Sequence, residues 1–342
     1  MTIALADNIS TMNAETNCSS QILSGYKPIY NATVVERIIK ANMTPGQKIS
    51  MGEFGMGKAN MPQELISRDD FLALVSDTGG EARRACAELG LTGIKPTYGA
   101  VSRYGLIANA SSLDQICTIG KNIKDCAALL EIISGADGID GTCILEKPFD
   151  FSDQKDHNAI KAKLQNLKIG IAENSLEGLQ QIKMFKDAGA SVENFEMPNL
   201  EYMIPIFQTI AFADISSNMS KYDGLKYGHR SSKAENLNDV YNLSRSEGFG
   251  WETKKKIMLG SLLLSSSYYD KYYRKALQGR SLIIDTYKKL FSQFDIIIAP
   301  LTDEFNVSIN LAGLPAVMLP AFQLTGPAFS EALLISAAGA VS

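Results

Sequence analysis

Histidine is almost absent from this chain, which has only His157 and His229 among 342 residues. A serine–histidine–aspartate triad would have to use one of them, yet neither is accompanied by the Gly-x-Ser-x-Gly turn that often presents such a serine. The five cysteines include no Cys-x-x-Cys pair. This pattern favours reduced, mostly buried thiols over a zinc site. We therefore expect no histidine-based hydrolase, no metal and no cofactor.

Long apolar runs and an excess of positive charge are missing too. No hydrophobic stretch reaches the roughly 18–20 residues that a membrane span needs. The N-terminal segment carries Asp7 and no basic residue ahead of it, unlike a signal peptide. The net charge of −4 gives little reason for unaided nucleic-acid binding. We expect a cytoplasmic protein that makes no direct contact with membrane or nucleic acid.

The order of predicted elements indicates the fold class. A strand over 167–172, a helix over 176–188 and a strand over 191–197 form a βαβ unit, which requires parallel pairing and an α/β fold. A capping box formed by Thr33 and Glu36 predicts a helix start, as does Asn122 before a second apolar stretch. Residues 254–294 are predicted to be rich in helix, 295–300 to form a buried strand, and 151–166 to form a linker.

One turn carries chemical information. Asp77, Thr78, Gly79 and Gly80 precede Glu81, and successive backbone N–H groups of such a turn can point at one position. That arrangement makes an anion nest or an oxyanion hole. From the residues alone, a tight connection before a helix explains the same turn.

This turn and the motifs after it resemble the amidase-signature family. The motifs are Gly-Ile-Lys-Pro-Thr-Tyr-Gly at 93–99, Val-Ser-Arg-Tyr-Gly-Leu at 101–106 and Ala-Ser-Ser-Leu-Asp-Gln at 110–115. Within the family they are most similar to A subunits of the glutamyl-tRNA(Gln) or aspartyl-tRNA(Asn) amidotransferases. The resemblance implies an α/β amidase-signature fold, with a mixed, largely parallel sheet flanked by helices. It also implies a single, shortened domain over residues 1–342.

The resemblance implies a catalytic lysine, a serine in cis conformation and a serine nucleophile. The lysine precedes Asp-Asn-Ile in the family, where this chain has Ala6. The nucleophile follows Asp-Thr-Gly-Gly, where this chain has Glu81, and the Gly-Gly-Ser-Ser-Gly-Gly-Ser stretch has no counterpart. We hypothesise a catalytically impaired or inactive homologue, a scaffold, regulator or decayed copy. Ala6 and Glu81 would be vestigial positions, and the oxyanion-type turn would be retained.

Substrate-binding positions are implied by the same resemblance. Arg280 and Asp303 fall where the family holds the amino-acid end of glutamine, and His229 replaces an aromatic contact. An ion pair for Arg280 and a loop cap for Asp303 are equally plausible structural roles. The implied partner is a B-type subunit that holds the tRNA, and the tyrosines of 268–273 would supply part of an apolar docking surface.

Two alternative functions stay open. The first is a functional amidase or glutaminase subunit that supplies ammonia for tRNA-dependent formation of glutamine or asparagine. It would use another nucleophile, such as Ser76 or Thr78. The second is a small-molecule binding module that reuses the residues around the site.

Overall fold

A ten-stranded sheet runs through the computed structural model, which describes residues 1–57, 59–152, 164–172 and 176–341. In space the strands follow the order β2-β1-β3-β5-β4-β9-β10-β8-β6-β7. In chain order they are β1 Thr2–Ala6, β2 Thr44–Ile49, β3 Leu72–Asp77, β4 Thr92–Lys95, β5 Gln115–Gly120, β6 Lys168–Ile171, β7 Ser191–Asn194, β8 Ile296–Ala299, β9 Ala316–Leu319 and β10 Phe322–Thr325.

Parallel pairing occupies both ends of the sheet, and antiparallel pairing occupies its middle. β1 pairs in parallel with β2 and β3, and β6 does so with β7 and β8. The five pairs between β3 and β8 are antiparallel. Since Ala4 lies opposite Ala73, the carboxyl ends of β1 and β3 meet at one edge. The predicted α/β class, with a mixed sheet between helices, is confirmed.

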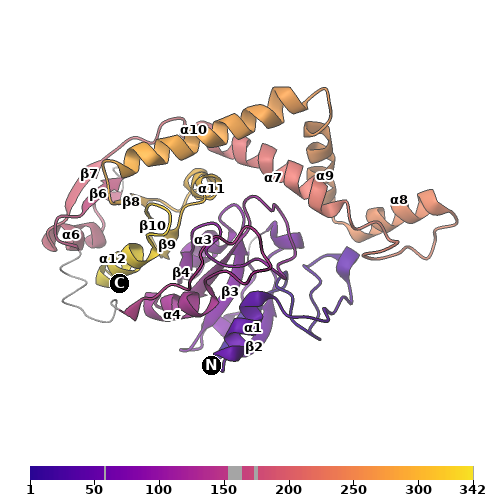
Figure 1. Cartoon of the computed structure of the whole chain (residues 1–342), viewed down its shortest axis with the longest axis horizontal. Helices are drawn as coiled ribbons and strands as arrows, with labels where there is room; N and C mark the ends of the chain where they lie inside the picture. The colour runs from indigo at the N-terminus through magenta and orange to yellow at the C-terminus, as the bar shows by residue number, and fades with distance from the viewer. Residues whose placement is uncertain (58, 153–163, 173–175, 342) are drawn as a thin grey trace.

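Helices cover both faces of this sheet (Figure 1). They are α1 Thr33–Lys40, α2 Gln63–Ile66, α3 Glu81–Leu89, α4 Ile123–Ile133, α6 Gln180–Asp187, α7 Met203–Met219, α8 Leu237–Gly248, α9 Trp251–Leu263, α10 Arg274–Phe291, α11 Asp303–Ala312 and α12 Glu331–Val341. Short turns of other helix types are η1 Gln21–Leu23, η2 Glu53–Gly55, η5 Leu200–Tyr202 and η6 Tyr269–Tyr273.

Strand β8 illustrates how the two cores are separated. Successive side chains of a strand point to opposite faces. Ile296 and Ile298 join the core that contains side chains of α1, α4 and α12. Ile297 and Ala299 join the core that contains side chains of α7, α10 and α11. All four side chains are buried, so the strand reads as a continuous apolar run.

Most of the predicted elements are present. Asn122 caps α4, since its side chain accepts from the N–H of Asp125 at 2.9 Å. Helix α1 begins at Thr33 as predicted, but the capping box is wrong. The Thr33 hydroxyl instead donates to Asp137 at 2.5 Å, and Glu36 accepts from the side chain of Asn31 at 2.7 Å. The N-cap residue is Ala32, and no side chain caps this end of the helix.

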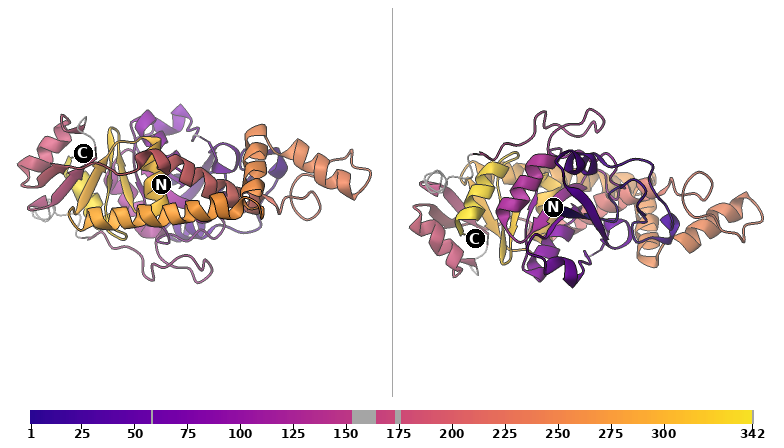
Figure 2. Two further views of the ribbon diagram at one scale, coloured as in Figure 1. Left: turned by 90° about the horizontal axis from the view of Figure 1, so that it is seen from above. Right: turned by 90° about the horizontal axis from the view of Figure 1, so that it is seen from below.

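The predicted βαβ unit is formed by β6, α6 and β7, and Ile169 lies opposite Val192 in parallel register. Within the predicted linker 151–166, residues 153–163 lie outside the described residues, and so does His157. Figure 2 shows an elongated molecule, with α8 projecting at one end and α6 at the other. Among the described residues, no helix combines the length and apolar character needed to cross a bilayer.

Candidate functional site

The turn after β3 is built around two glycines. Gly80 has φ +104°, and a Cβ there would lie 2.6 Å from the Cβ of Asn306. A Cβ on Gly79 would lie 2.5 Å from the ring of Phe207. Both positions therefore need glycine, one for its backbone conformation and both for space. The glycines let the chain leave β3 and enter α3 within three residues.

The backbone N–H groups of Thr78 and Gly79 converge on a single oxygen atom. That atom is Oε2 of Glu81, 2.8 Å from each nitrogen. Glu81 is buried, and burial, followed by the negative charge of Asp77, raises the pKa of its carboxyl. The turn is an anion nest with the geometry that an oxyanion requires. The chain's own carboxylate occupies it.

A buried polar network holds the nest in place. Asp77 and Arg83 form an ion pair of 3.0 Å with both side chains fully buried. Asn310 donates to Oδ1 of Asp77 at 2.7 Å and to the carbonyl of Thr78 at 2.6 Å. Burial would raise the pKa of Asp77, but Arg83 and Asn310 hold it below its usual value. Sequence reasoning did not assign this contact.

The two alternative nucleophiles are buried. The Thr78 hydroxyl donates to Oδ1 of Asp114 at 2.7 Å, and burial raises the pKa of Asp114 to about 6. Asp114 also accepts from the N–H of Asn109 at 2.9 Å. The Ser76 hydroxyl accepts from the side chain of Asn8 at 2.9 Å. Asp114 lies in the motif at 110–115, so the resemblance to the family already pointed to this segment.

Of the predicted substrate residues, Asp303 reaches the nest through Arg84. The Arg84 guanidinium lies 2.7 Å from Asp303 and 3.5 Å from Oε1 of Glu81. Sequence reasoning missed Arg84 because its partner Asp303 is 219 positions away. Arg280 donates to the carbonyls of Leu311 at 2.8 Å and Ser112 at 3.1 Å, and burial lowers its pKa.

His229 has a different setting. Its ring lies 3.0 Å from Glu247 of α8, and its backbone N–H donates to the carbonyl of Ile22 at 2.7 Å. Among the described contacts, none joins it to the nest. Ala6 is the last residue of β1 and is fully buried. Since β1 runs parallel to β3, Ala6 lies at the same edge of the sheet as the nest.

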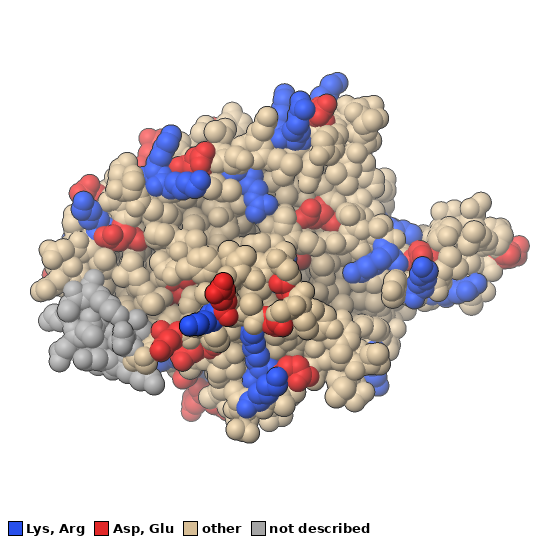
Figure 3. All heavy atoms as spheres, in the orientation of Figure 1, with Lys and Arg blue, Asp and Glu red and all other residues tan. Residues whose placement is uncertain are grey.

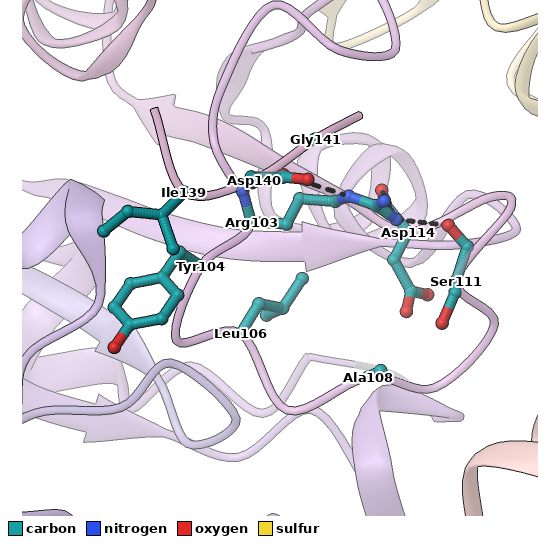
Figure 4. Close-up of a pocket in the computed structure, with 9 residues that line it drawn as sticks. All are labelled: Arg103, Tyr104, Leu106, Ala108, Ser111, Asp114, Ile139, Asp140 and Gly141. Carbon is teal, nitrogen blue, oxygen red and sulfur yellow. Dashed lines mark hydrogen bonds and ion pairs between the residues drawn. The ribbon is translucent and has the colours of Figure 1, made fainter. Parts of the chain in front are cut away.

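A cavity of about 270 Å³ lies beside Asp114. The Arg103 guanidinium lies between Asp140, at 3.7 Å, and the carbonyl of Ser111, to which it donates (Figure 4). Asp114 lines this cavity and also bonds Thr78, so the same side chain touches both features. The cavity therefore lies next to the nest and carries groups of both charges.

Comparisons with known proteins give consistent results. A family model described as "Amidase" matches residues 1–62 and 70–325. The glutamyl-tRNA(Gln) amidotransferase A subunit of Lachnoclostridium phytofermentans is 40% identical over 93% of this chain and 74% of its own length. The corresponding A subunit of Staphylococcus aureus is 38% identical over 95% of this chain and 77% of its own length.

Solved structures share the fold. The glutamyl-tRNA(Gln) amidotransferase A subunit of Thermotoga maritima has a TM-score of 0.75 and 29% identity, covering all of this chain and 82% of its own. The peptide amidase of Stenotrophomonas maltophilia has a TM-score of 0.78, also over the full chain and 82% of its own. At 21% identity, the second comparison supports the fold alone.

These comparisons correct one hypothesis. An inactive homologue was expected from Ala6, from Glu81 and from the missing Gly-Gly-Ser-Ser-Gly-Gly-Ser stretch. The relatives that cover 93–98% of this chain are A subunits of amidotransferases, and none of these findings points to inactivity. The hypothesis of a pseudoenzyme is therefore wrong, and the alternative of a functional subunit fits better. The hypothesis rested on Ala6, Glu81 and the absent Gly-Gly-Ser-Ser-Gly-Gly-Ser stretch, whereas the similarity to these A subunits extends over nearly the whole chain.

Proposed function

This chain belongs to the amidase family, and on that premise we propose that it is an A-type subunit of a tRNA-dependent amidotransferase. In this role it hydrolyses the carboxamide of glutamine and supplies ammonia for glutamine or asparagine formation on tRNA. The observation that carries the proposal is the convergence of the Thr78 and Gly79 N–H groups on one oxygen. We further propose that residues 1–342 act as one domain, since a single sheet runs through them.

Amide hydrolysis needs such donors because the carbonyl oxygen becomes negative during attack. Removing one preorganised donor from an oxyanion hole typically costs on the order of 10²–10³ in turnover. Glu81 fills the nest, so substrate must displace its carboxylate. Arg84, 3.5 Å from the other oxygen of Glu81, provides a positive charge beside the displaced group.

The amino-acid end of glutamine carries an ammonium and a carboxylate. Asp303 is exposed and pairs with Arg84, which also contacts Glu81 in the nest. Its carboxylate suits the ammonium. Arg280 suits the carboxylate, since a guanidinium binds it through paired hydrogen bonds. The role of His229 stays a prediction. Ala6 and Glu81 stand where the resemblance places a lysine and a nucleophile, so another side chain of this chain attacks the amide.

The proposed partner is a B-type subunit that holds the tRNA. Exposed apolar side chains lie on α9 and η6: Trp251 is 68% exposed, Met258 is 66% exposed and Tyr272 is 51% exposed. Trp, Tyr and Met are enriched in protein interfaces. Acidic and basic side chains are interspersed on the face drawn in Figure 3, which gives no broad basic surface there for RNA. Size-exclusion chromatography of the mixed subunits with light scattering tests this association. Separate elution of the two subunits would contradict it.

Asp303→Asn in the assembled complex tests the substrate assignment. Losing the carboxylate should raise KM for glutamine by about 10- to 100-fold, with kcat changed little, because a charge-assisted hydrogen bond contributes about 1.5–3 kcal/mol. Asp285→Asn, an exposed acid on α10 that pairs with Lys288, is the matched control. Equal KM values for the two variants would contradict the assignment.

A further inference from the structure

A second group of polar side chains gathers at the edge of the sheet where β1 ends. Cys18 and Ser19 both have φ +52°, a left-handed conformation that non-glycine residues rarely adopt. Consecutive strained residues of this kind concentrate at functional sites. The Cys18 side chain is fully buried in the core formed with Ile22 and Phe54. Ser19, the next residue, is exposed. The strained turn thus presents a serine to solvent.

The Ser19 hydroxyl is bound to a buried carboxylate. It donates to Oδ2 of Asp7 at 2.5 Å and lies 2.6 Å from the hydroxyl of Ser50. Asp7 is 6% exposed, and burial raises its pKa, which makes its carboxylate a stronger base. The other oxygen, Oδ1, is buried without a hydrogen-bond partner, and so is Oδ1 of the adjacent Asn8. Unpaired buried acceptors call for a ligand or water.

A lysine completes the group. Lys48 of β2 lies opposite Leu5 of β1 and donates to the carbonyl of Ile9 and to the hydroxyl of Thr11 at 2.9 Å. These contacts use two of the three protons of its ammonium. Burial lowers the pKa of Lys48 to about 8, and the negative charge of Asp7 acts in the opposite direction. Lys48 therefore brings a positive charge close to Asp7.

We propose that Ser19 is the nucleophile of an acyl-transfer site for primary carboxamides, with Asp7 as its base. This inference rests on the proposed function and names the side chain that attacks the amide. The Ser19 oxygen bonds to the carbonyl carbon while Asp7 takes the hydroxyl proton. The C–N bond then breaks, and the nitrogen leaves as ammonia with that proton. Water hydrolyses the ester on Ser19 and restores the hydroxyl.

The unpaired acceptors agree with this substrate class. A primary carboxamide presents two N–H donors on its nitrogen, and Oδ1 of Asp7 and Oδ1 of Asn8 are acceptors. The pair of Thr78 and Asp114 differs in two ways: the Thr78 hydroxyl is buried whereas Ser19 is exposed, and both oxygens of Asp114 already accept from backbone N–H groups. Of the hydroxyls of Ser19 and Thr78, substrate can reach that of Ser19.

A fluorophosphonate probe tests the proposal on the chain assembled with its B-type partner, followed by peptide mass mapping. Ser19 should be labelled, and Ser19→Ala should abolish labelling. Asp7→Asn should slow it by about 10²-fold, the usual contribution of a general base. Ser24→Ala, an exposed serine near the same turn, is the matched control. Thermal melting of each variant shows whether the fold is kept. If Ser19→Ala unfolds, Ser50→Ala serves as the second variant, because it removes the hydroxyl beside Ser19 and keeps the nucleophile.

The outcomes separate this inference from the proposed function. Labelling at Ser19 together with loss of glutamine hydrolysis in Ser19→Ala supports both. Glutamine hydrolysis that survives Ser19→Ala overturns the inference and leaves the function standing. Labelling at Ser19 without hydrolysis of glutamine supports a reactive serine and overturns glutamine as the substrate. Absence of both labelling and hydrolysis overturns both.

Discussion

Single residues decide what the nest can bind. Glu81 occupies the place where two backbone N–H groups converge, and it does so with the oxygen atom of a carboxylate. A carboxylate inside the chain competes with any substrate oxygen for the same donors. The residue that misled the prediction of function is thus also the residue that reveals the donors.

Glu81→Ala should empty the nest. Because the substrate no longer displaces an internal ligand, kcat/KM for glutamine should rise, by on the order of tenfold for a nest that is mostly filled. Ammonia release from the assembled complex measures the change. Glu64→Ala, an exposed acid on α2, serves as control and should leave kcat/KM as it was. A lower value for Glu81→Ala would mean that the carboxylate takes part in the reaction.

Lys95 should make stability depend on pH. Its ammonium is buried and donates to the carbonyl of Pro96 at 3.0 Å and to Gln115 at 3.1 Å. Burial lowers its pKa from 10.5 to about 7. Above pH 7 the folded chain releases this proton while the unfolded chain keeps it, so the free energy of unfolding rises with pH. The gain between pH 7 and 9 is about 2 kcal/mol.

Denaturant titration at pH 7, 8 and 9 measures this effect, with Lys95→Met as the comparison. The variant leaves carbonyl acceptors unpaired and should be less stable overall. Its stability should nevertheless lack the rise that Lys95 contributes, so the difference between the two proteins should widen with pH. Parallel pH profiles for wild type and variant would show that Lys95 does not titrate in this range.

Individual contacts were predicted unevenly. The turn at 77–80 was identified because glycines and a β-strand are local signals. Arg84 and Asn310 were missed, since Arg84 meets a residue 219 positions away and Asn310 reaches Asp77 across 233 positions. These contacts join α11 to α3 and to the end of β3, which no local pattern encodes. The contact between Asp7 and Ser19 was also missed, although only 12 positions separate the two residues.

Elements, in contrast, were largely predictable. The strands at 168–171 and 296–299 are short apolar runs, and α4 begins after a capping asparagine, so local propensity and burial agree. The start of α1 was predicted for the wrong reason, because Thr33 bonds Asp137, 104 positions away. Local rules located the helix but not the contact that the Thr33 side chain makes.

Asn122→Ala should measure what the cap of α4 contributes. The side chain accepts from the N–H of Asp125, and removing an N-cap of this kind costs about 1 kcal/mol. Chemical denaturation gives the free energy of unfolding. Lys124→Ala, an exposed position in the first turn, should change it by less than about 0.5 kcal/mol. Equal losses in both variants would contradict a specific role for the cap.

At the scale of the whole molecule, the sheet brings distant segments to one edge. The ends of β1 and β3 carry Asp7 and the nest, and α11 brings Asp303 toward them through Arg84. Exposed apolar side chains lie on α9 and η6, where we propose that the partner binds. The fold class was predictable from the order of strands and helices, whereas the meeting of these segments required the structure.

The most direct test of the proposed function follows the nitrogen atom itself. The chain is assembled with its B-type partner, glutamyl-tRNA, a nucleoside triphosphate that activates the glutamyl carboxylate, and glutamine labelled with ¹⁵N in its side-chain amide. Mass spectrometry then measures the label in ammonia and in the amino acid released from the tRNA. The account predicts labelled ammonia, together with labelled glutamine on the tRNA. Unlabelled products, or no ammonia above the rate of the partner alone, would contradict it.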